Sequence, residues 1–552
     1  MIKNNFIIKD IEKYLYNKKN ILIKTRFAPE PNGYLHLGHV KTIFINFFIA
    51  KKYNGIFNLR FDDTNPSNIN INYIKNIKND IKWLGFKWDG KVKYSSNYFL
   101  KIFKFAIYLI NKGLAYIDEL PLYIMNKYKG SFNKYGVNSP YRNRSIEENI
   151  YLFNKMKNGF FKENEVCLRA KINMNSSIIS MRDPVLYRIR FKSHIRTKNN
   201  WCIYPTYDFA NCISDYIEKI THSLCTIEFI NNKLLYNWII HNICKNDDIV
   251  PIQYEFSKLN LEYNVLSKSK LKKIINNNTI SGWNDPRILT ISGLKNKGYT
   301  SNSILDFCNK LGITKKNSVI KLSLLESCIR SDLDNKSFRL MAILEPISLY
   351  IKNLKDSYKN ILEIYNHPND KNLGKRKILF NNKIFIEKSD VIKYIYNEEL
   401  DFIFNKIIKL KYSYTIKILK VNKKYDNSID NIICECYLDS LNSIFFNKKK
   451  INIIIHWVSS LVNSKSKFFI YKNLFNHKHP YLLKNYNKYI NKHSILIKEG
   501  YIEKLNKNIF YKYKKMKSFQ LERIGYFYIN KKSKHNNIIL NEIINLKNNN
   551  IT

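Results

Sequence analysis

The sequence predicts a multidomain protein in which an α/β half is followed by a β-rich half. Two observations carry this prediction. Within residues 21–84, β-prone apolar stretches alternate with helices that have one apolar face. After Met341 the pattern changes to short alternating strands separated by loops rich in Asn and Lys. With 552 residues, the chain has room for three or four domains that each bury a core.

The N-terminal elements follow the order strand, helix, strand, helix. Residues 21–27 form a β-prone stretch, and prolines and a glycine at positions 29, 31 and 33 end it. The apolar residues of the next helix share one face: Val40, Ile43, Phe44, Phe47 and Phe48. Residues 56–61 form a second predicted strand, and residues 71–84 a second amphipathic helix. This order opens a doubly wound sheet, whose ligands bind beyond the carboxyl ends of the strands.

Two short motifs in this half predict a nucleotide site. The sequence HLGH at residues 36–39 stands at the start of the first predicted helix. Free backbone N–H groups and the helix dipole attract phosphate there, and Gly38 has no side chain to keep a nucleotide away from the backbone. Far downstream, LSKS at residues 266–269 supplies Lys268. We therefore expect His36, His39 and Lys268 to surround a triphosphate.

Helical patterns dominate residues 259–338, as in residues 301–311, where Ile304, Phe307, Cys308 and Leu311 share one face. Strands are predicted over residues 383–387, 414–421 and 451–458. The end of the chain, residues 531–552, is rich in Lys and Asn, and we expect it to fray.

The composition fits a partner covered in phosphates, since the net charge is +49 and the pI is near 9.7. An A+T-rich coding sequence would also produce many Lys, Asn, Ile, Tyr and Phe codons, so charge alone does not establish RNA binding. The nine cysteines include no CxxC pair, and Cys434 and Cys436 are expected on alternate faces of one strand. Neither a structural zinc site nor a disulfide framework is predicted. Because no segment reaches the roughly 18 uninterrupted apolar residues of a membrane span, we expect a cytoplasmic protein.

The motifs and their surroundings resemble class I aminoacyl-tRNA synthetases. HLGH is similar to their HIGH signature, and LSKS is similar to their KMSKS loop with Leu266 in place of Met. Further blocks resemble glutaminyl-tRNA synthetases, over about residues 21–528. These blocks are EPNGYLH (30–36), NLRFDDTNP (58–66), SPYR (139–142), RDPVLYR (182–188), HSLCTIE (222–228) and LNLEY (259–263).

The resemblance implies a class I, Rossmann-type nucleotide fold and a division of the chain. An N-terminal extension (1–20) would precede a catalytic domain in two halves (21–99 and 207–258), interrupted by an inserted domain that binds the tRNA acceptor end (100–206). A helical subdomain with the LSKS loop (259–338) and two anticodon-binding β-barrels (339–548) would follow.

The resemblance also implies a two-step reaction. The carboxylate of glutamine attacks the α-phosphate of ATP to give glutaminyl adenylate and pyrophosphate, and a ribose hydroxyl of the terminal tRNA adenosine then takes the glutaminyl group. The protein positions the reactants and stabilises negative charge on phosphate, so His36, His39 and Lys268 are the expected catalytic residues. Mg²⁺ would enter with ATP. Besides these three, the expected ATP contacts are Glu30, Asn32, Gly38, Lys258, Leu259 and Ser267.

Five further positions match residues that bind the amino acid. Arg26 and Asp62 match those that hold the α-carboxylate and the α-ammonium group, whereas Tyr207 and Gln253 match those that address the carboxamide, partly through water. Cys225 occupies a position at which glutamate enzymes resemble one another in carrying Arg. A neutral residue there favours a carboxamide over a carboxylate.

The expected tRNA contacts include several departures from the family pattern. Asn231 stands where an acidic residue usually contacts the acceptor end, and Lys409 and Lys411 replace arginines of the anticodon barrels. Lys258 likewise replaces an Arg near ATP. An amide both donates and accepts, and Lys lacks the bidentate fork of Arg, so we expect looser tRNA selection. Anticodon-contacting positions that match are Arg339, Gln520 and Arg523, although a lone Arg in a barrel is more often in a surface ion pair.

The expected partners are tRNA(Gln), ATP and L-glutamine, without a membrane, and we expect a monomer. The main alternative is a glutamyl-tRNA synthetase or an enzyme that charges both tRNAs. Cys225 and the YLHLGH context argue against it. A noncatalytic tRNA-binding relative is disfavoured by the joint retention of the candidate catalytic and amino-acid residues. A small nucleotidylyltransferase with an HxGH motif is excluded by size.

Overall fold

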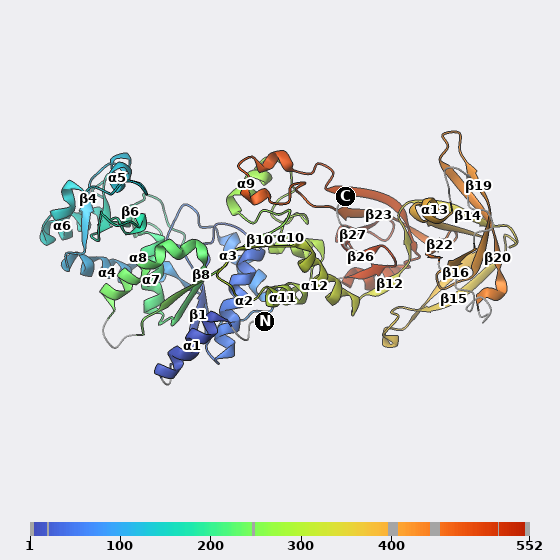
Figure 1. Cartoon of the computed structure of the whole chain (residues 1–552), viewed down its shortest axis with the longest axis horizontal. Helices are drawn as coiled ribbons and strands as arrows, with labels where there is room; N and C mark the ends of the chain where they lie inside the picture. The colour runs from blue at the N-terminus through green and yellow to red at the C-terminus, as the bar shows by residue number, and fades with distance from the viewer. Residues whose placement is uncertain are drawn as a thin grey trace.

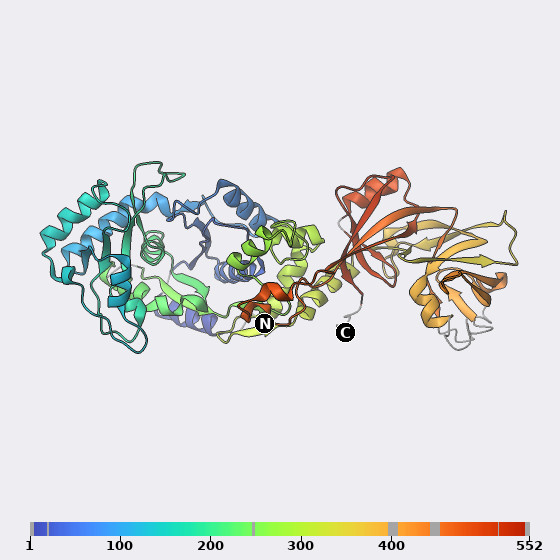
Figure 2. The ribbon, with the colours of Figure 1, turned by 90° about the horizontal axis from the view of Figure 1, so that it is seen from above.

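The computed structural model describes residues 5–18, 21–244, 249–395, 407–441, 453–516 and 518–546. Figures 1 and 2 show an elongated molecule. The segment of residues 95–206 lies at one end, the N-terminal sheet and the helices of residues 268–334 lie in the middle, and two β-sheets extend to the other end.

The N-terminal elements form a parallel α/β sheet. They are α1 (Phe6–Asn17), β1 (Lys24–Phe27), α2 (Leu37–Lys52), β2 (Ile56–Phe61), α3 (Ile71–Trp83) and β3 (Lys93–Tyr94), with the strand order β1-β2-β3. The strands β8 (His222–Thr226) and β9 (Ile252–Phe256) pair in parallel, and the Thr221 amide donates to the Lys24 carbonyl, which places β8 beside β1. The predicted strand, helix, strand, helix order is therefore confirmed. The carboxyl ends of β1, β2 and β8 face one side, where a ligand is expected.

The segment between β3 and β8 contains an antiparallel sheet of order β4-β5-β6-β7. Its elements are η1 (Ser95–Tyr98), α4 (Phe99–Asn111), β4 (Ala115–Asp118), α5 (Leu122–Lys129), η2 (Pro140–Asn143), α6 (Ile146–Lys157), β5 (Cys167–Ala170), η3 (Ile179–Met181), β6 (Val185–Ile189) and β7 (Ile203–Pro205). One apolar core joins it to α7 (Tyr207–Ile217) and α8 (Lys233–Ile243), which flank η4 (Ile227–Asn232). The predicted boundary at 206/207 stays a proposal, because this core continues across it.

Helices follow in the middle of the molecule. They are α9 (Lys268–Asn276), α10 (Ile291–Lys297), α11 (Ser301–Leu311) and α12 (Leu322–Asp334), with β10 (Leu259–Leu261) paired to β11 (Ser318–Ile320). The helix predicted over residues 301–311 is confirmed as α11, which buries Ile304, Phe307 and Cys308. Helices α10, α11 and α12 share one core with α2 and α3, so this region is packed onto the N-terminal sheet.

Two seven-stranded, nearly closed sheets make up the C-terminal half within the described residues. Their orders are β12-β25-β26-β27-β23-β24-β13 and β21-β18-β19-β20-β14-β17-β22, and each has its own apolar core. In the first sheet lie β12 (Phe338–Leu340), β13 (Ala342–Ile343), β23 (Asn463–Tyr471), β24 (Ile495–Glu503), β25 (Phe519–Leu521), β26 (Gly525–Ile529) and β27 (Ile538–Asn545). In the second lie β14 (Pro346–Ile351), β17 (Lys383–Glu387), β18 (Ile407–Leu410), β19 (Thr415–Lys423), β20 (Ile429–Tyr437), β21 (Ile454–Ile455) and β22 (Trp457–Ser459).

Shorter elements accompany these sheets. They are the ribbon of β15 (Lys359–Tyr365) and β16 (Lys375–Asn381), the helices α13 (Lys388–Tyr394) and α15 (Lys507–Lys515), and the turns η5 (Lys371–Leu373), η6 (Leu438–Leu441), η7 (Pro480–Leu482) and η8 (Tyr486–Tyr489). The strand predicted over residues 383–387 is confirmed as β17, and that over residues 414–421 corresponds to β19. The third, over residues 451–458, is divided into β21 and β22, while 451 and 452 lie outside the described residues.

Two predictions for this half are wrong. Cys434 and Cys436 lie on the same face of β20 and are both buried, because a strand returns to one face every second residue. The chain end was expected to fray from residue 531, yet residues 538–545 form β27, which lies between β26 and β23 and buries Ile538, Leu540 and Ile543. Apolar alternation within this Lys- and Asn-rich stretch was the signal for a strand. Residues 547–552 lie outside the described residues.

The connection between β23 and β24 reaches back to α9. The Lys270 ammonium donates to the carbonyls of Tyr481 and Leu483, at 2.7 and 3.3 Å, and the Tyr486 hydroxyl donates to the Lys270 carbonyl at 3.3 Å. Leu474, Phe475 and Tyr486 share an apolar cluster with residues of α9. The helix that begins with the LSKS motif is therefore held by residues about 200 positions downstream. No helix within the described ranges is long and apolar enough to span a membrane.

Candidate active site

A cavity of about 860 Å³ opens where β1, β2 and β8 end. Its lining includes every predicted ATP-binding residue and four of the five predicted glutamine-binding residues, namely Glu30, Asn32, His36, Gly38, His39, Lys258, Leu259, Ser267 and Lys268 together with Arg26, Asp62, Tyr207 and Cys225. The fifth, Gln253, lines a small adjoining pocket with Arg26, Tyr207 and Cys225. The fold thus brings together residues that lie more than 200 positions apart.

The N-terminus of α2 fixes the two histidines of the HLGH motif. His36 is the N-cap, and its Nδ1 accepts from the Gly38 amide at 3.1 Å, while His39 Nδ1 accepts from the His36 amide at 3.1 Å. Because both Nδ1 atoms accept backbone hydrogens, each neutral ring carries its proton on Nε2. Burial and the nearby charges of Lys268 and Lys258 lower the pKa of His36 to about 3, and burial together with His36 keeps the pKa of His39 well below its usual value. Both imidazoles are therefore neutral Nε2–H donors.

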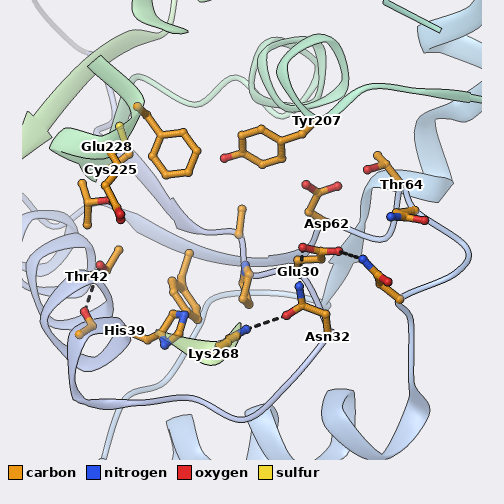
Figure 3. Close-up of a pocket in the computed structure, with 18 of the residues that line it drawn as sticks. Glu30, Asn32, His39, Thr42, Asp62, Thr64, Tyr207, Cys225, Glu228 and Lys268 are labelled. Atoms are coloured by element: carbon orange, nitrogen blue, oxygen red, sulfur yellow. Dashed lines mark hydrogen bonds between the residues drawn. The ribbon is translucent and has the colours of Figure 1, made fainter. Parts of the chain in front are cut away.

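Lys268 lies on the same side of the cavity as His39, in the first turn of α9 (Figure 3). Its ammonium donates to Asn32 Oδ1 at 2.8 Å, and the side-chain nitrogen of Asn32 donates to the Glu30 carboxylate at 2.6 Å (Figure 3). Burial lowers the pKa of Lys268 to about 8, so it is largely protonated at neutral pH. The N-cap of α9 is Ser267, whose side chain makes no cap hydrogen bond. The N-termini of α2 and α9 thus both border the cavity, which favours an anion.

Asp62 lies across the cavity from His39 and Lys268, beside Tyr207 (Figure 3). It is 5% exposed, and burial raises the pKa of its carboxyl to about 7. One of its oxygens, Oδ1, has no hydrogen-bond partner among the residues that the structure describes. A buried carboxylate oxygen without a donor is costly, so this atom is suited to receive a ligand cation.

Arg26 enters the cavity from β1 with its charge already balanced. Its Nε contacts both oxygens of Asp215, at 2.9 and 3.2 Å, and Asp215 also pairs with Arg60 at 2.8 Å. Burial alone would raise the pKa of Asp215, but Arg26 and Arg60 hold it below its usual value. The Nη1 of Arg26 makes only a long contact, 3.5 Å, with the Leu224 carbonyl. This guanidinium therefore keeps a donor for a ligand although it adds little net charge.

The side chains of Cys225 and Tyr207, at one end of the cavity, are polar and uncharged. Burial raises the pKa of the Cys225 thiol to about 12 and the pKa of the Tyr207 hydroxyl still further, so neither ionises at neutral pH. The Gln253 amide nitrogen donates to Glu255 at 3.0 Å, and Lys233 pairs with Glu255 at 3.2 Å. Because the Glu255 carboxylate accepts from the side-chain nitrogen of Gln253, the side-chain oxygen of Gln253 is left as an acceptor for a ligand.

Comparison with known proteins agrees with this geometry. Residues 22–335 match the catalytic domain of the tRNA synthetases class I (E and Q), and residues 337–437 and 454–530 match anticodon-binding domains of the same group. The chain belongs to the class I tRNA synthetases for glutamate and glutamine.

Two relatives resemble this synthetase over nearly its whole length. It is 50% identical over 559 residues to the glutamine–tRNA ligase of Buchnera aphidicola subsp. Schizaphis graminum, and the alignment covers 99% of this chain and 97% of the relative. It is 44% identical over 544 residues to the glutamine–tRNA ligase of Aliivibrio fischeri, which covers 98% of both chains. A solved glutamate tRNA ligase from Elizabethkingia meningosepticum, in complex with its amino acid, is 18% identical, with a TM-score of 0.43 over 57% of this chain and 70% of that chain.

The predicted tRNA-contacting residues of this synthetase lie outside the cavity. Asn231 is exposed on η4, where its carbonyl accepts from the Ser180 hydroxyl at 2.6 Å. Arg339 and Gln520 are register partners on β12 and β25. Arg339 also pairs with Asp334 at 2.6 Å.

Three other predicted contacts are already engaged. The Arg523 guanidinium pairs with both oxygens of Asp390, which is the ion pair considered as the alternative for a lone Arg. The Lys409 ammonium donates to the Ser440 carbonyl at 3.1 Å, and Lys411 pairs with Glu522. Their tRNA contacts stay predictions, and they require exchange of these partners.

Sequence reasoning missed several residues that shape the site of this synthetase. Thr42, Thr64, Asn68, Glu228 and Phe229 line the cavity, and the last two lie within or beside the block HSLCTIE that already carried the resemblance. Lys258, expected near ATP, pairs with Glu228 at 2.6 Å on the cavity rim. The described residues contain no group of three or more His, Cys, Asp or Glu that is placed to hold a metal ion.

Proposed function

We propose that this synthetase joins L-glutamine to tRNA(Gln) in two steps, with ATP as the activating substrate. Glutamine's carboxylate attacks the α-phosphate of ATP, which forms glutaminyl adenylate and releases pyrophosphate. A ribose hydroxyl of the terminal tRNA adenosine then attacks the activated carbonyl, and AMP leaves. The names and full-length identities of the relatives support this proposal.

The uncharged side chains at one end of the cavity are the observation that favours glutamine over glutamate as the substrate. Uncharged donors and acceptors come from Tyr207, Cys225 and the side-chain oxygen of Gln253. The charge of Arg26 is offset by Asp215. A carboxamide can pair with such groups, whereas a carboxylate would be desolvated there without a matching cation. The unpaired oxygen of Asp62 is suited to the α-ammonium group, and the remaining donor of Arg26 to the α-carboxylate.

The opposite end of the cavity is suited to the phosphates of ATP. His36 and His39 present neutral Nε2–H donors, and Lys268 adds a cation that can leave Asn32 when phosphate arrives. Preorganised donors of this kind stabilise charge that develops during phosphoryl chemistry without covalent participation. Mg²⁺ enters as part of the substrate MgATP. The Ser267 hydroxyl, which makes no cap hydrogen bond, is a further phosphate contact in this proposal.

The test is aminoacylation of total tRNA with labelled glutamine and glutamate in parallel. We expect kcat/KM for glutamate to be lower by about 10³-fold or more, since the carboxylate gains no partner in this pocket. Glutamate within about tenfold of glutamine would instead identify an enzyme of dual specificity. Binding of tRNA without charging of either amino acid would identify a noncatalytic relative.

We further propose that the chain acts as a monomer in the cytoplasm. Sedimentation of the purified chain, with and without tRNA, tests the first part, because a stable dimer would double the mass in both cases.

A further inference from the structure

A buried histidine of the inserted segment is joined to the residue that follows Asp62. His194, which is fully buried, donates from Nε2 to the Asp63 carbonyl at 2.8 Å. Its Nδ1 accepts from the amides of Arg196 and Thr197, each at 3.1 Å. These acceptor contacts place the ring proton on Nε2. The donor toward Asp63 is thus fixed by the turn in which His194 lies.

Asp63 is held to the same segment by its side chain. Its carboxylate, which is fully buried, accepts from the Ser96 amide at 2.8 Å and from the Ser96 hydroxyl at 2.6 Å. Arg196 donates to the Ser96 hydroxyl at 3.1 Å and covers the Tyr94 ring at 3.7 Å. Both polar groups of Asp63, the carbonyl and the carboxylate, therefore point away from the cavity and toward residues 95–197.

Asp62 and Thr64, the two neighbours of Asp63, line the cavity instead. The Thr64 side chain opposes the effect of burial on the pKa of the Asp62 carboxyl. Asp62 Oδ1 has no hydrogen-bond partner among the described residues. The Asp63 carbonyl belongs to the peptide bond that joins Asp63 to Thr64. The hydrogen bond from His194 therefore fixes the orientation of this peptide, and with it the directions in which the Thr64 and then the Asp62 side chains point.

We propose that His194 is a positioning residue for the amino-acid site, acting through the Asp63–Thr64 peptide on Asp62. This inference rests on the proposed function, in which Asp62 receives the α-ammonium group of glutamine. It adds that His194 contributes to glutamine affinity through its hydrogen bond to the Asp63 carbonyl, without touching glutamine itself. The contact crosses 131 residues of sequence.

Two substitutions separate the functions of the His194 ring nitrogens. His194→Asn keeps an acceptor near the Nδ1 position for the Arg196 and Thr197 amides and loses the donor toward Asp63. His194→Gln places an amide N–H near the Nε2 position and loses the acceptor. We expect H194N to raise KM for glutamine about 5- to 10-fold, the range for one neutral hydrogen bond, and H194Q to stay within about twofold of the wild type. KM for ATP should change by less than about twofold in both.

His367 offers a matched control because it repeats the same local geometry elsewhere. Its Nε2 donates to the Asp334 carbonyl at 2.8 Å, and its Nδ1 accepts from the Asn369 and Asp370 amides at 3.2 and 3.1 Å. His367→Asn therefore removes the same kind of buried hydrogen bond outside the cavity. At saturating tRNA, it should leave KM for glutamine unchanged even where it lowers the melting temperature.

Thr64→Val tests the route from His194 to Asp62. If both residues act along one path, T64V should raise KM for glutamine as H194N does, and the double variant should be no worse than the poorer single variant. Additive effects would refute the route. If H194N does not fold, T64V with H194Q still tests it.

The outcomes distinguish this inference from the proposed function. If the wild type charges glutamine and H194N has wild-type KM values, or raises KM for ATP and glutamine together, His194 is not a positioning residue for this site. An equal effect of H367N would also overturn the inference. If the wild type does not charge glutamine, the proposed function itself fails and the inference, which rests on it, falls as well.

Discussion

Gly38→Ala should impair catalysis while leaving the fold intact. Gly38 is the second residue of α2, and a Cβ added to it would lie 2.9 Å from His36 Cε1 and 3.0 Å from His36 Nδ1. The closest such contact in ordinary packing is near 3.4 Å, so the imidazole must move by about half an ångström. The ring has little room, because the His39 ring packs against it at a tilt, with ring centroids 3.8 Å apart. The displaced His36 imidazole carries the Nε2–H group that we propose donates to ATP.

The expected loss of kcat follows from how strongly catalysis depends on the position of the groups that contact the substrate. A misplacement of about 1 Å can cost about 10²-fold, so half that distance should lower kcat about tenfold. Alanine is intrinsically a better helix former than glycine, by up to about 1 kcal/mol, which offsets part of the cost of displacing the ring, so the melting temperature should change little. Activity and stability are thus expected to change independently.

Gly33→Ala is the matched control, because its added Cβ would lie 3.4 Å from Lys268 Cδ, an ordinary contact with a flexible side chain. Pyrophosphate exchange in the presence of tRNA, combined with thermal unfolding, is the assay. We expect kcat of G33A within about threefold of the wild type and kcat of G38A about tenfold lower, at a similar melting temperature. The reasoning is wrong if G38A retains wild-type kcat, or if it loses activity only because it unfolds.

Three further predictions follow from the charges of the molecule. The pH profile of kcat/KM for glutamine should be bell-shaped, since Asp62 must lose its proton, with a pKa of about 7, and Lys268 must keep its own, with a pKa of about 8. Activity should therefore rise through neutral pH and decline in the alkaline range, and a flat profile would contradict both assignments. Affinity for tRNA should fall steeply with salt because each neutralised phosphate releases counterion; a flat plot of log K against log salt would mean that the +49 charge is compositional. Asn231→Asp should raise the penalty for a noncognate acceptor pair by about 1 kcal/mol, measured by charging of acceptor-mutant transcripts, and equal discrimination by both proteins would show that Asn231 does not reach the RNA.

Local patterns predicted the elements that frame the cavity. The apolar periodicity of residues 40–48 and 71–84 and the β-prone stretch at 56–61 correspond to α2, α3 and β2, which pack into a shared core. The single apolar face predicted for α2 is incomplete, because Ile45 and Ile49 on its other side are buried in a second cluster. The two motifs predicted the nucleotide end, since a helix N-terminus with histidines and a distant lysine has a physical meaning in the sequence alone. The amino-acid end came from resemblance to a family.

What the sequence did not indicate are the partners of the site residues. Asp215 contacts Arg26 across 189 positions, and His194 contacts Asp63 across 131. No periodicity or spacing marks such pairs, because they depend on how sheets and inserted segments are placed in space. The same limit explains why the ion pair of Arg523 with Asp390 was considered only as a general alternative.

The contact between α9 and the connection of β23 to β24 has a consequence for synthesis. Lys270 and Tyr486 are 216 residues apart, so the helix that carries Lys268 lacks this support until the ribosome has completed most of the chain. At about 5–20 residues per second, that interval lasts roughly 10–40 s. During this time the apolar residues of α9 that face Leu474 and Phe475 lack their partners. The nascent chain therefore depends on its last quarter to complete the catalytic half.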